Sequence, residues 1–293
     1  MNIPNQNPYS DATQAQLARY RTAPINPAYY MVGNKDPEKP AAYIAHDQGL
    51  HTLTYSALVE ESSRWAGYLH ELGVRTGTRV AGLLPKRKEL LGVVLGVWRL
   101  GAVYVPLFTA FGREAVQYRL KHSGTQVVLT DSANLAKLPQ DSTTVVINVD
   151  EAVPPPRHEF DDWTPTTPDH PMILLYTSGT TGHPKGVVVP VQALATFDAY
   201  MRWGLDLKDG DRFWNLADPG WATGCTSASS ALGFWVKPTI GMLIPLHRTP
   251  SSILSANGRL PTLPPLPPHI VPSALKGSDS AHTPGAQQRW RAP

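Results

Sequence analysis

The stretch YTSGTTGHPKGVVV, residues 176–189, joins four Ser and Thr residues, three glycines and one lysine to a run of valines. Glycines let successive backbone N–H groups turn toward one anion, and the hydroxyl groups add further donors. Lys185 adds a positive charge on a flexible side chain that can follow a polyphosphate. A surface turn can have a similar glycine and hydroxyl content, but the lysine and the flanking apolar runs favour a phosphate-binding loop.

The residues after Lys185 indicate which kind of phosphate loop this is. A Walker A loop ends in Gly-Lys-Ser/Thr and continues directly into a helix. Here Gly186 follows the lysine, and the sequence VVVP at 187–190 predicts a strand because β-branched residues favour extended backbone. A Rossmann dinucleotide site is also not indicated, since no G-x-G-x-x-G follows an early strand. The pattern therefore predicts a loop between two strands.

The residues before this loop alternate between helical and extended patterns. Helices are predicted at 54–72, from Pro85 through Trp98, and at 112–124, and glycines follow each of them. Strands are predicted at 78–84, 102–107, 125–130, 143–148 and 172–177. Such alternation predicts an α/β fold with a doubly wound, mainly parallel sheet and helices on both faces. Within it, the basic triplet at 86–88 is interpreted as the solvated first turn of a helix.

Composition narrows the class of protein. Hydrophobic residues make up 42% of the 293 residues, which is enough for a core, and the net charge of +3 does not indicate a nucleic-acid partner. A single cysteine, Cys225, excludes an intramolecular disulfide and a Cys-rich metal site. The N-terminal residues resemble no secretory signal, and the stretch ELLGVVLGVW is too short for a membrane span. We therefore expect a cytoplasmic protein without a membrane span.

The last part of the chain differs in composition from the rest. Residues 225–293 contain one acidic residue, six basic residues and 11 of the 29 prolines, including PTLPPLPP. We therefore expect two parts, a folded region at 1–224 and a disordered, low-complexity tail at 225–293. A polyproline ligand for an SH3-type partner is the functional alternative for this tail. The proline-rich segment 153–171 is expected to be an irregular connector.

Three stretches of the chain resemble one enzyme superfamily. LLYTSGTTGHPKG, residues 174–186, is similar to the AMP-binding signature of acyl-adenylate-forming enzymes, which include AMP-forming acyl-CoA synthetases, luciferases and peptide-synthetase adenylation domains. Residues 53–108 are similar to the opening of this superfamily, up to a Gly-Ala-x-Tyr-x-Pro turn. DRFWNLADPGWATG, residues 211–224, is similar to acetyl-CoA-synthetase-like members. The resemblance covers roughly residues 20–224 and implies the large N-terminal domain of these enzymes.

The resemblance implies a two-step reaction. A carboxylate attacks the α-phosphate of ATP to give acyl-AMP and pyrophosphate, and the thiol of CoA then displaces AMP. It implies ATP, Mg²⁺ and CoA as cofactors and a short- to medium-chain carboxylic acid as the small-molecule substrate. The expected ATP phosphate-binding residues are Thr177, Ser178, Gly179, Thr180, Thr181, Gly182 and Lys185. The expected CoA and acyl region contains Asp218, Trp221 and Thr223. We expect no metal-binding site formed by the side chains of the protein itself.

Members of this superfamily continue with motifs that residues 225–293 do not contain. These motifs are Tyr-Gly-x-Thr-Glu, Thr-Gly-Asp, Gly-Arg-x-Asp and a C-terminal domain with the lysine used in adenylation. No catalytic residue is therefore assigned. Residues 1–224 are expected to be an incomplete AMP-binding domain and 225–293 a frame-shifted or mispredicted tail. The alternatives are a non-catalytic nucleotide-binding remnant and an unrelated phosphate-binding protein.

Overall fold

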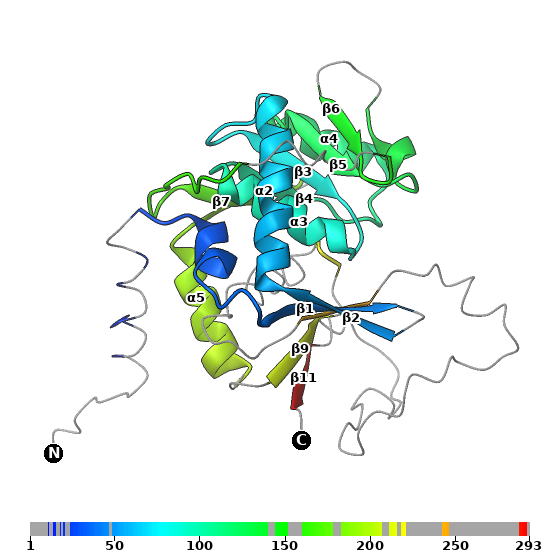
Figure 1. Ribbon diagram of the computed structural model, residues 1–293. Coiled ribbons are helices and arrows are strands. Elements are labelled where there is room, and N and C mark those ends of the chain that lie inside the picture. The colour runs from blue at the N-terminus through cyan, green and yellow to red at the C-terminus, as the bar shows by residue number, and fades with distance from the viewer. Residues whose placement is uncertain are drawn as a thin grey trace, which may run out of the picture.

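The computed structural model describes the following parts of the chain: residues 24–46, 49–139, 144–151, 160–177, 183–206, 211–215, 218–220, 242–245 and 287–291, with Asp11, Gln14, Ala15, Ala18 and Tyr20. It contains a six-stranded sheet with helices packed against it and a second, five-stranded sheet (Figure 1).

The six-stranded sheet has the order β6-β5-β3-β4-β7-β8. Its strands are β3 (Arg79–Leu83), β4 (Val103–Pro106), β5 (Val127–Thr130), β6 (Val145–Asn148), β7 (Pro171–Thr177) and β8 (Lys185–Pro190). Every neighbouring pair is parallel except β7 and β8, which are antiparallel. The prediction of a mainly parallel α/β sheet is therefore confirmed, as is the strand expected after the glycine loop.

Three helices connect or precede these strands. They are α2 (Tyr55–Glu71), α3 (Lys88–Arg99) and α4 (Arg113–Ser123). At the start of α2, the Thr54 hydroxyl accepts a hydrogen bond from the backbone N–H of Ala57 at 3.2 Å, as an N-cap should. Gly124 ends α4 with a left-handed φ of 63°, a conformation that glycine adopts without a steric penalty. The three predicted helices are confirmed, although α3 begins at Lys88 and not at Pro85.

Alternating side chains of the strands build a core on each face of the sheet. Val80, Tyr104 and Val127 belong to the larger core, together with the buried residues of α2 and α3. Their chain neighbours Ala81, Val105 and Val128 belong to a smaller core, which contains Val116 and Leu120 of α4. Since successive side chains of a strand point to opposite faces, α3 and α4 cover opposite sides of the sheet. The doubly wound arrangement with helices on both faces is therefore confirmed.

Helices α2 and α3 pack closely because α3 has glycines where α2 has a tryptophan. A Cβ atom on Gly96 would lie 2.8 Å from Cβ of Trp65 and 2.9 Å from the backbone nitrogen of Ala66. Gly92 similarly faces the indole ring of Trp65. The indole of Trp98 is buried, and its Nε1–H donates to the carbonyl of Met172 in β7 at 2.9 Å. This contact fixes the end of α3 to the start of β7.

The second sheet has the order β11-β9-β10-β1-β2. It joins the antiparallel strands β1 (Pro40–His46) and β2 (Gly49–Thr54) to β10 (Met242–Pro245), β9 (Asp211–Asn215) and β11 (Gln287–Arg291). The short elements η1 (Tyr29–Gly33), η2 (Leu135–Lys137), α5 (Ala193–Ala199) and η3 (Tyr200–Gly204) complete the described structure. The division of the chain at residue 224 remains a prediction.

The connector at 160–170 contains no helix or regular strand but is anchored to the helices. The guanidinium of Arg99 donates to the carbonyls of Asp161 and Asp162 and lies 3.8 Å from the ring centroid of Trp163.

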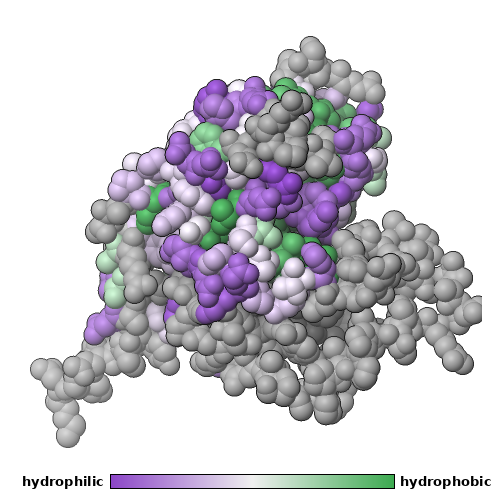
Figure 2. Space-filling model, in the orientation of Figure 1, coloured by the Kyte–Doolittle hydropathy of each residue, from purple (hydrophilic) through white to green (hydrophobic). Residues whose placement is uncertain are grey.

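Hydrophilic residues cover much of the face seen in Figure 2, with smaller hydrophobic areas between them. Within the described parts of the chain, no helix has the length and apolar character needed to cross a membrane.

Candidate functional site

The carboxyl ends of the five parallel strands, β3 to β7, lie at one edge of the six-stranded sheet. β3, β4, β5 and β7 all run in the same direction, so the residues that follow Leu83, Pro106, Thr130 and Thr177 lie along this edge. In open parallel sheets, ligands bind outside the carboxyl ends of the strands, where the connections to opposite faces diverge. The strand order places that point between β3 and β4, beside β7.

Two predicted phosphate-binding residues are described at this edge. Thr177 is the last residue of β7, Lys185 is the first residue of β8, and the two form a cross-strand pair. Both are exposed to solvent. The other predicted members, Ser178, Gly179, Thr180, Thr181 and Gly182, lie outside the described residues. The hairpin thus brings the lysine back to the position where β7 ends, whereas a Walker loop would continue into a helix.

Asp218 lies at the same edge, next to the end of β4. Its carboxylate accepts hydrogen bonds from the hydroxyl of Thr109 at 2.6 Å and from the backbone N–H of Gly220 at 2.7 Å. A Cβ atom on Gly220 would lie only 2.2 Å from the backbone nitrogen of Phe108, so this position requires glycine. Trp221 and Thr223, the other residues expected near CoA and the acyl group, lie outside the described residues.

Lys86 is a site residue that the sequence prediction missed. Burial lowers the pKa of the Lys86 ammonium to about 8, while the negative charge of Asp218 acts in the opposite direction. Burial also raises the pKa of Asp218, although hydrogen bonds from Thr109 and Gly220 and the charge of Lys86 favour its ionised form. A half-buried lysine and a half-buried carboxylate thus lie near enough at this edge for the charge of each to affect the pKa of the other.

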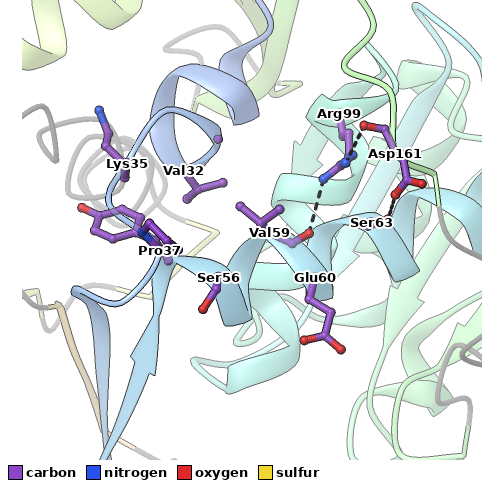
Figure 3. Close-up of a pocket in the computed structure, with 11 residues that line it drawn as sticks. Val32, Lys35, Pro37, Ser56, Val59, Glu60, Ser63, Arg99 and Asp161 are labelled. Carbon is purple, nitrogen blue, oxygen red and sulfur yellow. Dashed lines mark hydrogen bonds between the residues drawn. The ribbon is translucent and has the colours of Figure 1, made fainter.

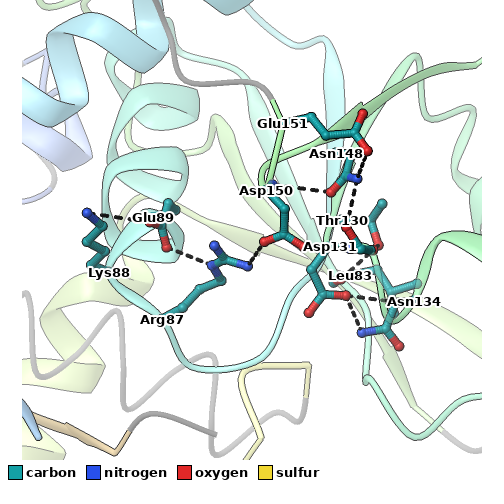
Figure 4. Close-up of polar contacts among 11 residues, drawn as sticks. Leu83, Arg87, Lys88, Glu89, Thr130, Asp131, Asn134, Asn148, Asp150 and Glu151 are labelled. Atoms are coloured by element: carbon teal, nitrogen blue, oxygen red, sulfur yellow. Dashed lines mark hydrogen bonds and ion pairs between the residues drawn. The ribbon is translucent and has the colours of Figure 1, made fainter. Parts of the chain in front are cut away.

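The predicted solvated helical turn at 86–88 is therefore wrong for two of its three residues. Helix α3 begins only at Lys88, and Arg87 precedes it in extended conformation. The guanidinium of Arg87 pairs with Glu89 at 2.6 Å and with Asp150, after β6, at 2.7 Å (Figure 4). The pKa of Asp150 is lowered to about 2, chiefly by the hydrogen bond from the backbone N–H of Ser132 and then by Arg87. These contacts fix the β3–α3 turn that carries Lys86.

Lys137 is a further cation near Asp218, since both residues form a hydrogen bond with Thr109. The ammonium of Lys137 donates to the carbonyl of Thr109 at 2.5 Å and to the side-chain carbonyl of Asn134 at 2.8 Å. Asn134 in turn donates its side-chain amide to the carboxylate of Asp131 at 2.8 Å (Figure 4). Three lysines therefore lie at this edge, Lys86 after β3, Lys137 after β5 and Lys185 at the start of β8, together with the carboxylates of Asp131, Asp150 and Asp218.

Metal-binding side chains do not gather in the described parts of the chain: no group of three or more His, Cys, Asp or Glu residues there could hold an ion. A cavity of about 460 Å³ lies away from the hairpin, between η1, the start of α2 and Arg99 (Figure 3). Lys35, whose pKa burial lowers to about 8, lines it together with Glu60 and Asp161. None of the predicted site residues lines this cavity.

Sequence comparison finds one matching family. The profile of the family described as AMP-binding enzyme matches residues 31–234. Among curated proteins, the acetyl-coenzyme A synthetase of Bacillus subtilis (strain 168) is 34% identical over 225 residues, which covers 69% of this chain and 39% of that enzyme. The acetyl-coenzyme A synthetase of Pyrobaculum arsenaticum is 32% identical over 210 residues, which covers 59% of this chain and 31% of that enzyme.

Structure comparison gives the same fold. The crystal structure of an acyl-CoA synthetase from Brucella canis superposes with a TM-score of 0.70 at 32% sequence identity and covers 81% of this chain. The chain spans 47% of that structure. It therefore corresponds to less than half the length of the relatives described here.

Proposed function

Because the chain belongs to the AMP-binding enzyme family, we propose that its carboxyl edge is the nucleotide site of an AMP-forming acid–CoA ligase. The observation that carries this proposal is the cross-strand pair of Thr177 and Lys185 at the end of parallel strand β7. A strand–loop–strand hairpin places a hydroxyl and an ammonium on the two ends of one glycine-rich loop. Such an arrangement suits a polyphosphate rather than a single phosphate.

The proposed first step is attack of a carboxylate oxygen on the α-phosphorus of ATP, with pyrophosphate as the leaving group. Negative charge accumulates on the leaving pyrophosphate, so groups that stabilise it there lower the barrier. We assign this role to Lys185 as an electrostatic clamp and to Thr177, Ser178, Gly179, Thr180, Thr181 and Gly182 as hydrogen-bond donors. Mg²⁺, when bound through the phosphate oxygens, would neutralise part of the remaining charge.

The second proposed step is attack of the CoA thiol on the acyl-AMP, which forms the thioester and releases AMP. Asp218, Trp221 and Thr223 are proposed to shape the region where the acyl group and CoA meet. Asp218 is held in place by Thr109 and Gly220, and its charge is matched by Lys86. Since two relatives are acetyl-coenzyme A synthetases, we propose a short- to medium-chain carboxylic acid as substrate.

A second function is binding of ATP without turnover. The observation that favours it is that residues 225–293 contain none of the later motifs expected from the superfamily resemblance. In this case the hairpin would still bind the phosphates of ATP, but no acyl-AMP would form. The two functions share the same nucleotide site and differ in catalysis alone.

ATP–pyrophosphate exchange separates these two functions. The 293-residue chain is incubated with MgATP, labelled pyrophosphate and carboxylic acids from acetate to octanoate, with Lys185→Ala as the control. Exchange above this control, dependent on the acid, supports adenylation. Binding of MgATP without exchange supports the second function. If the chain shows no MgATP binding and no exchange, both functions are contradicted.

A further inference from the structure

One face of α4 contacts both ends of the glycine loop. Tyr118 and His122 are one helical turn apart and therefore point in the same direction. The ring of Tyr118 stacks on that of His183, with centroids 5.1 Å apart and an angle of 13° between the planes. The hydroxyl of Tyr118 also donates to the carbonyl of Pro184 at 3.4 Å. Both contacts are made directly before Lys185.

The other end of the loop is held from the same helix. Nδ1 of His122 lies 2.7 Å from the hydroxyl of Tyr176, the residue before Thr177, and a hydrogen bond joins them. The two rings also meet edge to face, with centroids 5.6 Å apart. Tyr118 and His122 stack on one another as well, at 5.6 Å. The four rings thus form a continuous row from His183 through Tyr118 and His122 to Tyr176.

We propose that Tyr118 and His122 are positioning residues that hold Thr177 and Lys185 at the carboxyl edge of the sheet. This inference rests on the proposed phosphate-binding role of the hairpin and adds the element that supports it. The β7–β8 hairpin gains no such support from its outer side within the described structure, since β8 is the last strand of the sheet there. Offset-stacked and edge-to-face ring pairs stabilise a fixed geometry beyond the area they bury.

The arrangement explains why two aromatic side chains, those of Tyr118 and His122, lie on one face of a polar helix. His122 and His183 are exposed, whereas Tyr176 packs against the smaller core, so the row leads from the core to the solvent-exposed end of the loop. Arg119, the neighbour of Tyr118, is buried, and its guanidinium lies 4.0 Å from the ring centroid of Phe111. The same guanidinium lies 5.7 Å from the ring centroid of Tyr176, so Arg119 contacts both Phe111 and one end of the row. His183 is exposed and makes the stacking contact with Tyr118.

The test measures hairpin order and ligand affinity separately. Hydrogen–deuterium exchange of the Thr177, Lys185 and Gly186 amides is compared in the wild-type chain and in Tyr118→Ala, Tyr118→Leu and Tyr118→Phe. Tyr200→Ala serves as the matched control because Tyr200 is 51% exposed and lies on η3. We expect Tyr118→Ala and Tyr118→Leu to exchange about five- to tenfold faster at these amides, and Tyr118→Phe to remain within about twofold of wild type.

Rescue by phenylalanine but not by leucine distinguishes ring stacking from simple burial. The same variants are titrated with magnesium pyrophosphate, where Tyr118→Ala is expected to bind about tenfold more weakly than Tyr200→Ala. Exchange rates in Tyr118→Ala equal to those in Tyr200→Ala would overturn the positioning role. If exchange rises as expected but neither wild type nor Tyr118→Phe binds pyrophosphate, the positioning contact stands and the proposed phosphate site fails.

Discussion

Lys86 and Asp218 are 132 positions apart in the chain but lie at the same carboxyl edge. Burial disfavours the charged form of each, while the charge of the other favours it. The lysine loses hydration, which disfavours its charged form, and the nearby carboxylate recovers only part of this cost. The aspartate loses hydration too, but Thr109 and Gly220 donate hydrogen bonds to it. Such a pair is costly for stability and is typical of sites where charge serves binding.

The pH dependence of stability should report this burial. The pKa of Lys86 is about 8 in the folded chain, against 10.5 for an ordinary lysine. Between pH 8 and pH 10.5, Lys86 is therefore mostly deprotonated in the folded chain but protonated in the unfolded chain. Stability should therefore rise with pH across this window. In Lys86→Met, the unfolding free energy is expected to rise with pH by about 1 kcal/mol less than in the wild type. The difference is no larger because Lys86 is partly exposed, and water reduces the effect of burial on its charge.

Urea unfolding at pH 7.5 and pH 10 measures this difference, with Lys88→Met as the control. The side chain of Lys88 is 69% exposed, and no change in the pH dependence is expected for it. Equal rises in the two variants would show that Lys86 is fully hydrated in the folded chain.

At the scale of the elements, the sequence predicted each helix and strand of the six-stranded sheet. Local signals were sufficient there: glycines follow the helices, and β-branched runs mark the strands. What could not be predicted depends on contacts between distant residues. The basic triplet at 86–88 resembles a solvated helical turn until Asp150 and Asp218 are placed beside it. Likewise, the row on α4 requires the knowledge that His183 lies opposite Tyr118.

The α2–α3 contact gives a prediction at this scale. In an exposed helix, replacing glycine with alanine increases stability by about 1 kcal/mol. At Gly96 the added Cβ would meet the backbone of Ala66 at 2.9 Å and the side chain of Trp65 at 2.8 Å, so the helices must separate. Gly96→Ala is therefore expected to lower the unfolding free energy by about 2 kcal/mol.

Denaturant unfolding tests this expectation, with Gly112→Ala as the matched control. An added Cβ at Gly112 would meet no atom within 4 Å. A Gly96→Ala chain as stable as Gly112→Ala would mean that α2 and α3 are not in close contact.

At the scale of the whole molecule, the chain corresponds to 39% of its Bacillus subtilis relative. Its six-stranded sheet ends in β8, where Val187 and Val188 are 44% and 56% exposed. An edge strand with exposed valines can pair with a second chain, so it favours association. The proposed nucleotide site lies at the start of this same strand, which links the integrity of the edge to the proposed function.

Association through β8 should respond to a single charge. Val188→Lys is expected to reduce light scattering at a fixed protein concentration, because a charged side chain on an edge strand opposes pairing. The unfolding free energy should change by less than about 0.5 kcal/mol, since Val188 is mostly exposed. Thr196→Lys adds the same charge to an exposed position of α5 and serves as the control. Equal scattering by the two variants would exclude β8 as the associating edge.

The most direct measurement for the central claim is the affinity of the 293-residue chain for MgATP, obtained by isothermal titration calorimetry. Wild type is compared with Lys185→Ala and with Lys88→Ala, which removes an exposed lysine from the start of α3. We predict that Lys185→Ala binds MgATP at least about tenfold more weakly, since loss of a charged hydrogen bond to phosphate has this magnitude. Lys88→Ala should bind as wild type does. Equal affinities in all three chains would contradict a phosphate site at the β7–β8 hairpin.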